Sequence, residues 1–229
     1  MPRVVALPGM DGTGVLLSSF IEASEGHFDV EVIAYPDDRA MTYEELAGYI
    51  IEHLPKCGRF FLLGESFGGP LALIVASRAP AGLAGVILCA SFARFPVAPL
   101  RLLSPFARFT PAWHPAPVIS WLLLGRWASP ELMERLLAVL VELRPEVLRA
   151  RIAAALKVDV LGAVSRLALP VLLLRATEDR VIPAAASAAI ARVAQAAQLV
   201  DVQAPHFMLQ SAPTDCVRHI VGFTRGAAF

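Results

Sequence analysis

Short runs of Val, Ile, Leu and Phe recur along the chain, separated by segments whose apolar positions follow helical spacing. This alternation is typical of βαβ units and of a parallel sheet that is buried on both faces. The predicted strands cover residues 4–7, 30–34, 60–64, 85–89, 171–175 and 198–203. The fold class is therefore predicted to be α/β, with about six parallel strands flanked by helices.

Several helix signals lie between these strands. Thr42 followed by Glu45 is a capping box, which predicts a helix that continues to about Leu54. Residues 184–197 and 214–223 are further predicted helices on the faces of the sheet.

The strand pattern stops between about residues 92 and 161, where prolines and helix starts such as Ser129-Pro130-Glu131 replace it. This region is predicted to be a helical cap inserted into a single domain that spans residues 1–229. All three tryptophans, Trp113, Trp121 and Trp127, lie in it. They are interpreted either as an apolar pocket roof or as the packing core of the cap.

The composition limits the class of partner. The 229 residues suit one domain, and 20 basic side chains balance 20 acidic ones. No overall field would therefore draw the protein to nucleic acid or to an acidic membrane. The expected partner is a small molecule.

The apolar fraction of 56% and the mean hydropathy of +0.60 raise the question of a membrane segment. The longest uncharged stretches, residues 79–93 and 109–125, are interrupted by prolines and fall short of the roughly 18 to 20 residues that span a bilayer. The start of the chain has too short an apolar run for a secretory signal. We expect a cytoplasmic protein without a transmembrane segment, and the apolar cap leaves transient interfacial contact open.

Cys57, Cys89 and Cys216 are odd in number and widely separated, and no compact four-ligand set surrounds them. Neither disulfides nor zinc is expected, so all three are interpreted as packing residues. No metal or other cofactor is predicted.

The segment Gly64-Glu65-Ser66-Phe67-Gly68 lies between a predicted strand and an apolar helix. A serine on such a sharp turn projects its hydroxyl above the sheet, and the flanking glycines leave room for the turn. The G-x-S-x-G string by itself also fits a glycine-rich turn. Its position between strand and helix favours Ser66 as a nucleophile.

A serine hydroxyl needs a base to accept its proton, and histidine is the usual one. His206 follows the last predicted strand, at the edge of a parallel sheet where active-site groups gather. His53 and His219 fall in predicted helices, His27 in a turn and His114 between prolines of the cap. His206 is therefore the predicted base.

The base needs a carboxylate that orients its ring. Asp179 lies just beyond the fifth predicted strand, and the resulting chain order of serine, aspartate and histidine is the one that the nucleophile-elbow fold uses. Its rivals are Glu178, Asp159 and Asp201.

The oxyanion formed on attack requires backbone amide donors. Phe67 supplies one predicted donor, and Met10 in the loop Leu7-Pro8-Gly9-Met10-Asp11-Gly12-Thr13-Gly14 supplies the other. A phosphate-binding interpretation of this loop lacks the Gly-Lys-Ser/Thr ending and an acidic ribose partner.

Together, LPGMDGTG, GESFGGP, the loop at Asp179 and the Pro205-His206-Phe207 loop resemble the α/β-hydrolase superfamily of serine esterases and lipases. More narrowly, LPGMDGTG and GESFGGP are similar to segments of bacterial hydrolases that are related to plant esterase/acyltransferases. The resemblance implies carboxylesterase or lipase-like activity through an acyl-enzyme, with Met10 and Phe67 forming the oxyanion hole. Pro8 stands where many relatives have His before the oxyanion glycine, a departure that leaves open what supports this loop.

The predicted function is hydrolysis of a carboxylic ester with an apolar acyl group. Phe207 and the three tryptophans of the cap, Trp113, Trp121 and Trp127, are the predicted pocket residues. The alternatives are an acyltransferase or thioesterase that uses the same triad, and a non-catalytic hydrolase-fold binding protein.

Overall fold

The computed structural model describes residues 1–96 and 115–227 of the chain. Its sheet has the strand order β2-β1-β3-β4-β5-β6, and all neighbouring strands are parallel. The strands are β1 (Arg3–Leu7), β2 (Asp29–Val32), β3 (Phe60–Glu65), β4 (Leu83–Cys89), β5 (Val171–Ala176) and β6 (Ala197–Val202). The predicted sheet of six parallel strands is confirmed.

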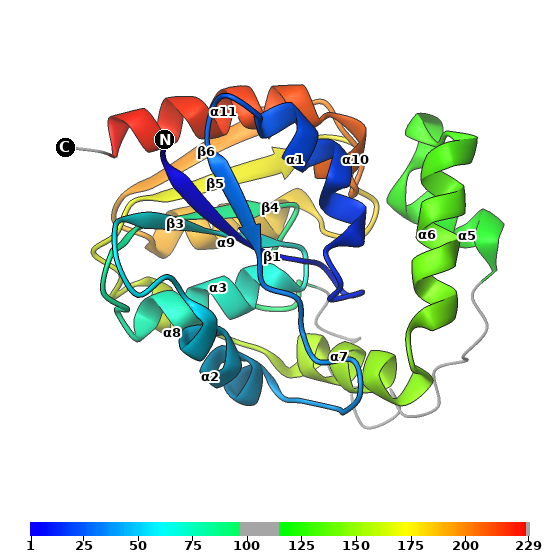
Figure 1. Cartoon of the computed structure of the whole chain (residues 1–229), viewed down its shortest axis with the longest axis horizontal. Helices are drawn as coiled ribbons and strands as arrows, with labels where there is room; N and C mark the ends of the chain where they lie inside the picture. The colour runs from blue at the N-terminus through cyan, green and yellow to red at the C-terminus, as the bar shows by residue number, and fades with distance from the viewer. Residues whose placement is uncertain (97–114, 228–229) are drawn as a thin grey trace.

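Helices cover both faces of this sheet, as Figure 1 shows. One face carries α1 (Ser18–Ser24), α10 (Met208–Ser211) and α11 (Pro213–Gly226), with the short 3-10 helix η1 (Val15–Leu17) leading into α1. The other carries α2 (Tyr43–His53), α3 (Gly68–Ser77), α8 (Leu161–Val164) and α9 (Ala184–Val193). The molecule therefore has three layers, with the sheet in the middle.

Side-chain alternation along the strands explains the two cores. Val4 and Ala6 pack against one layer of helices, whereas Val5 and Leu7 pack against the other, because successive strand residues point to opposite faces. The central strands β3 and β4 are buried along their whole length, and the edge strand β2 is not. This is why the central strands read as continuous apolar runs in the sequence.

The predicted capping box is present at the start of α2. The Thr42 hydroxyl accepts a hydrogen bond from the Glu45 amide, and the Glu45 carboxylate accepts one from the Thr42 amide. The packing role predicted for the cysteines is wrong for Cys57, which is exposed, whereas Cys89 and Cys216 are buried. Cys57 lies in the turn after α2, where it has no core to face.

A helical insert joins β4 to β5. Its described elements are α5 (Ala116–Leu123), the 3-10 helix η3 (Gly125–Trp127), α6 (Pro130–Glu142) and α7 (Pro145–Lys157). Figure 1 shows α5 and α6 standing beyond the ends toward which the strands point. Leu136 and Val139 of α6 pack on Leu16, and Leu148 of α7 packs on Met10. The insert thus contacts loops at the carboxyl edge of the sheet.

The order of the strands defines where a site can form. The chain moves outward from β1 to β2 and then crosses back to β3, so the loops after β1 and β3 diverge at their carboxyl ends. Such a switch point is where open α/β sheets bind ligands. Leu7 is paired with Gly64, so the loop after β1 lies directly beside the turn that carries Ser66.

No helix within residues 1–96 and 115–227 combines the length and the apolar character that crossing a membrane requires.

The substitution Gly64→Ala tests the close approach of β3 and α3. A methyl group at Gly64 would overlap the Gly68 carbonyl group, and backbone cannot easily move aside. We expect the free energy of unfolding to fall by about 2 to 4 kcal/mol in urea titrations. Gly48→Ala in α2 is the matched control, because a methyl group there meets no atom and should leave stability unchanged or slightly higher. Equal effects of the two substitutions would contradict the packing argument.

Candidate active site

Ser66 occupies the sharp turn between β3 and α3, with a φ of 47° that side-chain-bearing residues rarely adopt. The surrounding structure holds this conformation in place. The Ser66 amide donates to the Cys89 carbonyl over 2.9 Å, and the Ser66 carbonyl accepts a hydrogen bond from the Ser91 hydroxyl over 2.6 Å. Strain of this kind persists only where neighbouring groups over-determine it.

His206 and Asp179 complete a hydrogen-bonded chain that begins at Ser66. The Ser66 Oγ lies 2.9 Å from His206 Nε2, and His206 Nδ1 lies 2.8 Å from Asp179 Oδ2. The His206 and Asp179 side chains are each only 4% exposed. The three predicted residues come from the loops after β3, β5 and β6, and the fold brings them together at one edge of the sheet.

The second oxygen of Asp179 fixes the direction of this carboxylate. Asp179 Oδ1 accepts hydrogen bonds from the amides of Val181 and Ile182 over 2.7 and 2.8 Å. This leaves Oδ2 aimed at His206, the geometry that holds one tautomer of an imidazole ring.

The rival carboxylates have other partners. Glu178 binds Arg126, Asp159 binds Arg94, and Asp201 binds Arg175 on the neighbouring strand.

The two predicted oxyanion donors come from the start of α3 and from the loop after β1. Phe67 follows Ser66 directly at the start of α3, and its ring is buried against Tyr43 with ring centroids 4.7 Å apart. Gly9 and Met10 border the same cavity as Ser66. Phe67 is thus adjacent to Ser66 in the chain, and Met10 shares a cavity with it.

The loop after β1 has a support that the sequence did not reveal. The Tyr35 hydroxyl donates to the Pro8 carbonyl over 2.7 Å, and burial raises the pKa of Tyr35, which keeps the hydroxyl protonated as a donor. Gly68 also packs against the Leu7 and Pro8 carbonyls so closely that a methyl group would not fit. These contacts hold the backbone of the loop after β1 at Pro8.

Ser66 and His206 open into a cavity of about 320 Å³. Its walls are largely aliphatic, and they come from η1, α5, α6, α7 and the loops after β1, β5 and β6. The apolar lining residues are Met10, Leu16, Ile119, Leu123, Leu136, Leu140, Leu148, Ile152, Val181 and Phe207. A volume and lining of this kind suit a small apolar ligand with one reactive polar end.

Of the predicted pocket residues that the structure describes, Phe207 lines the cavity, whereas Trp121 and Trp127 do not. Trp121 is 59% exposed with the Arg180 guanidinium over its ring, and Trp127 donates to Glu178. Neither Trp121 nor Trp127 borders the cavity, because α5 and α6 turn leucine and isoleucine side chains toward it instead. Trp113 lies outside the described residues.

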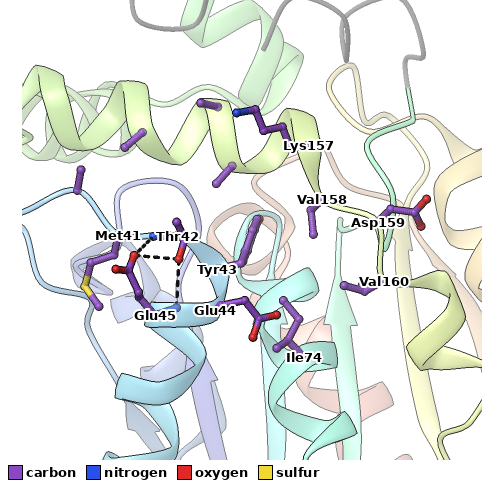
Figure 2. A pocket seen from close by; sticks show the side chains of 14 residues that line it. Met41, Thr42, Tyr43, Glu44, Glu45, Ile74, Lys157, Val158, Asp159 and Val160 are labelled. Atoms are coloured by element: carbon purple, nitrogen blue, oxygen red, sulfur yellow. Dashed lines mark hydrogen bonds between the residues drawn. The ribbon is translucent and has the colours of Figure 1, made fainter. Parts of the chain in front are cut away.

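A larger cavity of about 520 Å³ lies elsewhere, between the start of α2 and the end of α7. Figure 2 shows Thr42, Tyr43 and Lys157 around it. None of Ser66, Asp179 and His206 lines it, so the smaller cavity is the candidate active site. Within residues 1–96 and 115–227, no cluster of three or more His, Cys, Asp or Glu side chains is arranged to hold a metal ion.

Glu65 is a buried carboxyl group in the cavity that the sequence prediction missed. It precedes Ser66, is 5% exposed, and accepts hydrogen bonds from Gln210 Nε2 over 2.8 Å and from the Gly9 amide. Burial raises the pKa of Glu65 to about 7, because these hydrogen bonds only partly compensate for the loss of water. Nothing in the local sequence distinguishes Glu65 from a surface glutamate.

The raised pKa predicts a loss of stability with rising pH. Between about pH 4.5 and pH 7 the folded protein retains a proton on Glu65 that the unfolded chain has released, so unfolding becomes easier as pH rises. Glu65→Gln removes this dependence. We expect its unfolding free energy relative to wild type to increase by up to about 3 kcal/mol between about pH 5 and pH 8 in urea titrations. Glu142→Gln, at an exposed position of α6, should show no such trend. A difference independent of pH would contradict the burial argument.

Comparisons with known proteins agree with this architecture. The solved structures that superpose on the chain include a thermophilic esterase from Thermogutta terrifontis with malate bound, at 22% identity, covering 100% of this chain and 91% of that one with a TM-score of 0.80. A hydrolase from Pseudomonas aeruginosa PA01 superposes at 21% identity, covering 97% and 89% with a TM-score of 0.79. The enol-lactonase from Burkholderia xenovorans LB400 does so at 19% identity, covering 98% and 91% with a TM-score of 0.80.

At such identities these likenesses show the fold. A search of curated proteins finds no significant match. The sequence model of the alpha/beta hydrolase family, however, matches residues 3–219, nearly the whole chain. The protein therefore belongs to the alpha/beta hydrolase family.

Proposed function

We propose that this protein is a serine hydrolase that cleaves carboxylic esters with an apolar acyl group through an acyl-enzyme. The observation that carries this proposal is the hydrogen-bonded chain of Ser66, His206 and Asp179, which opens into an aliphatic cavity. A nucleophile, its base and the group that orients the base are the parts that acyl transfer requires.

In the first half of the reaction, the Ser66 Oγ attacks the ester carbonyl while His206 Nε2 accepts the hydroxyl proton. Asp179 holds the proton on His206 Nδ1 and stabilises the imidazolium that forms. The carbonyl oxygen becomes an oxyanion, to which the Met10 and Phe67 amides donate. The carbon–oxygen bond to the alcohol then breaks, and the imidazolium donates its proton to the leaving oxygen.

In the second half, a water molecule attacks the acyl-enzyme. His206 accepts a proton from that water, and the same amides stabilise the second oxyanion. The bond between Ser66 Oγ and the acyl carbon breaks, the imidazolium returns its proton to Ser66, and the carboxylic acid leaves. Enzyme and base are regenerated, so the net reaction consumes one ester and one water.

The apolar cavity wall supports a preference for an apolar acyl group. Leu136 and Leu140 of α6 and Ile152 of α7 border the space that Ser66 opens into. Removing a hydrocarbon chain from water stabilises binding by about 0.8 kcal/mol for each methylene group that is buried. Affinity should therefore rise with acyl length until the cavity is full.

Ser66→Ala tests the nucleophile. We expect hydrolysis of p-nitrophenyl esters to fall at least about 10⁴-fold and labelling by a fluorophosphonate probe to disappear, while the circular dichroism spectrum stays unchanged. Ser165→Ala, at an exposed serine outside the site, should retain full activity and labelling. Ester turnover at the wild-type rate in the Ser66 variant would refute the assignment.

Leu140→Trp tests the acyl-binding role of the cavity, because the added ring volume should fill part of it. We expect kcat/KM for long-chain p-nitrophenyl esters to fall about 10-fold or more relative to the acetate ester. Val141→Trp is the matched control, since Val141 is the next residue of α6 and is 80% exposed. A parallel change for short and long esters would argue against acyl binding there.

Product analysis in the presence of an added alcohol tests which acceptor the acyl-enzyme uses. We expect the free acid to remain the main product, because water is the acceptor in the proposed reaction. If the main product is instead the ester of the added alcohol, the protein is an acyltransferase that uses Ser66, His206 and Asp179.

A further inference from the structure

Arg151 of α7 is a buried cation that the reaction above does not use. It is only 2% exposed, yet it lies on a helix of the insert. Its Nη1 donates to the Met10 and Asp11 carbonyls over 3.0 and 2.6 Å, and its Nη2 donates to the Pro36 carbonyl over 3.1 Å. The guanidinium therefore reaches from the insert into the loop after β1.

The partners of Arg151 are unusual for a buried charge. Within the part of the chain that the structure describes, no carboxylate lies within ion-pair distance of it. Burying a charge is costly unless hydrogen bonds compensate, and here the hydrogen bonds come from backbone carbonyls. The loop and the guanidinium thus stabilise each other's position.

These contacts fix the orientation of the Met10 amide. The Gly9 carbonyl, which shares a rigid peptide plane with the Met10 amide, accepts a hydrogen bond from Gly12 over 3.1 Å. The Met10 carbonyl on the other side is held by Arg151. With both flanking peptide planes held, the direction of the Met10 N–H is determined.

The approach of Arg151 depends on Gly12. Gly12 has a φ of 75°, and a methyl group on it would overlap the Arg151 guanidinium. The same α7 surface also forms part of the cavity wall, because Leu148 and Ile152 lie on either side of Arg151 in the helix and both line the cavity. One side chain therefore connects the acyl-binding wall to the loop after β1.

We propose that Arg151 is a positioning residue that holds the Met10 amide toward the carbonyl oxygen attacked by Ser66, and so couples the inserted helix α7 to oxyanion stabilisation. This inference rests on the proposed function. It differs from support by Tyr35 and Gly68, because it comes from the insert and acts on the donor residue itself.

The test compares Arg151→Lys and Arg151→Ala with wild type. Lysine keeps the charge but lacks the planar fork that reaches several carbonyls, so both variants should lose kcat for a p-nitrophenyl ester about 10- to 100-fold. KM should change less than about threefold. Millimolar guanidinium chloride should restore part of the activity of Arg151→Ala and none of that of Arg151→Lys, whose side chain occupies the site. An unchanged kcat in both variants, or a loss confined to KM, would overturn the proposal.

Arg144→Ala is the matched control. Arg144 precedes α7, is exposed, and donates to the Asp38 carbonyl, which is close in sequence to the Pro36 contact of Arg151, and not to the Met10 carbonyl. We expect its kcat to match wild type and guanidinium to have no effect. A kcat loss equal to that of Arg151→Ala would assign the effect to docking of the insert and not to the loop.

Hydrogen exchange gives a readout that needs no substrate. Amides of residues 9–12 should exchange faster in both Arg151 variants than in wild type, while amides of β3 and β4 keep their protection. Unchanged exchange at residues 9–12 would overturn the positioning role of Arg151, whatever the activity of the variants. If wild type cleaves no ester and takes up no fluorophosphonate, the proposed function fails, and faster exchange would still show that Arg151 holds the loop.

Discussion

The candidate site depends on one close approach of backbone to backbone, at the crossing of β1, β3 and the start of α3. Gly64 lies against Gly68, and Gly68 lies against the carbonyls of Leu7 and Pro8, with no space for a methyl group at either glycine. This contact forces the chain through a left-handed conformation at Ser66 and places the Met10 loop beside it. The candidate nucleophile and the loop of the proposed donor Met10 are therefore positioned by the same contact.

The helical insert is fastened to the loops that carry the reactive groups. Arg126 pairs with Glu178 beside Asp179, and the Phe207 amide donates to the Leu123 carbonyl. Arg151 binds the Met10 loop. The walls of the cavity and the loops that carry Asp179, His206 and Met10 thus share the same contacts. A rearrangement of the insert would disturb the loops after β1, β5 and β6 together. The shape of the cavity and the positions of Met10, Asp179 and His206 therefore depend on each other.

Glu65, next to Ser66, lowers the stability of the folded protein where its carboxyl group is ionised. Its carboxyl group accepts hydrogen bonds from the Gly9 amide and from Gln210, which lies in α10 four residues after His206, so it connects the loops on the two sides of the cavity. Burial that raises the pKa of Glu65 to about 7 is destabilising when the group is ionised. Such polar groups are retained where they order a site more than they stabilise a fold.

The sequence by itself determined the strands, the capping box of α2 and the choice of Ser66, Asp179 and His206 as candidates, because periodicity and turn chemistry are local properties. Because all strands are parallel, the loops after β3, β5 and β6, which carry those three residues, lie at the same edge of the sheet. The tertiary structure alone decided that aliphatic side chains line the cavity in place of Trp121 and Trp127, and that Glu65 and Arg151 are buried. Which face of an inserted helix meets the site depends on contacts between residues more than one hundred positions apart, such as Arg151 and Met10, and local patterns carry no record of them.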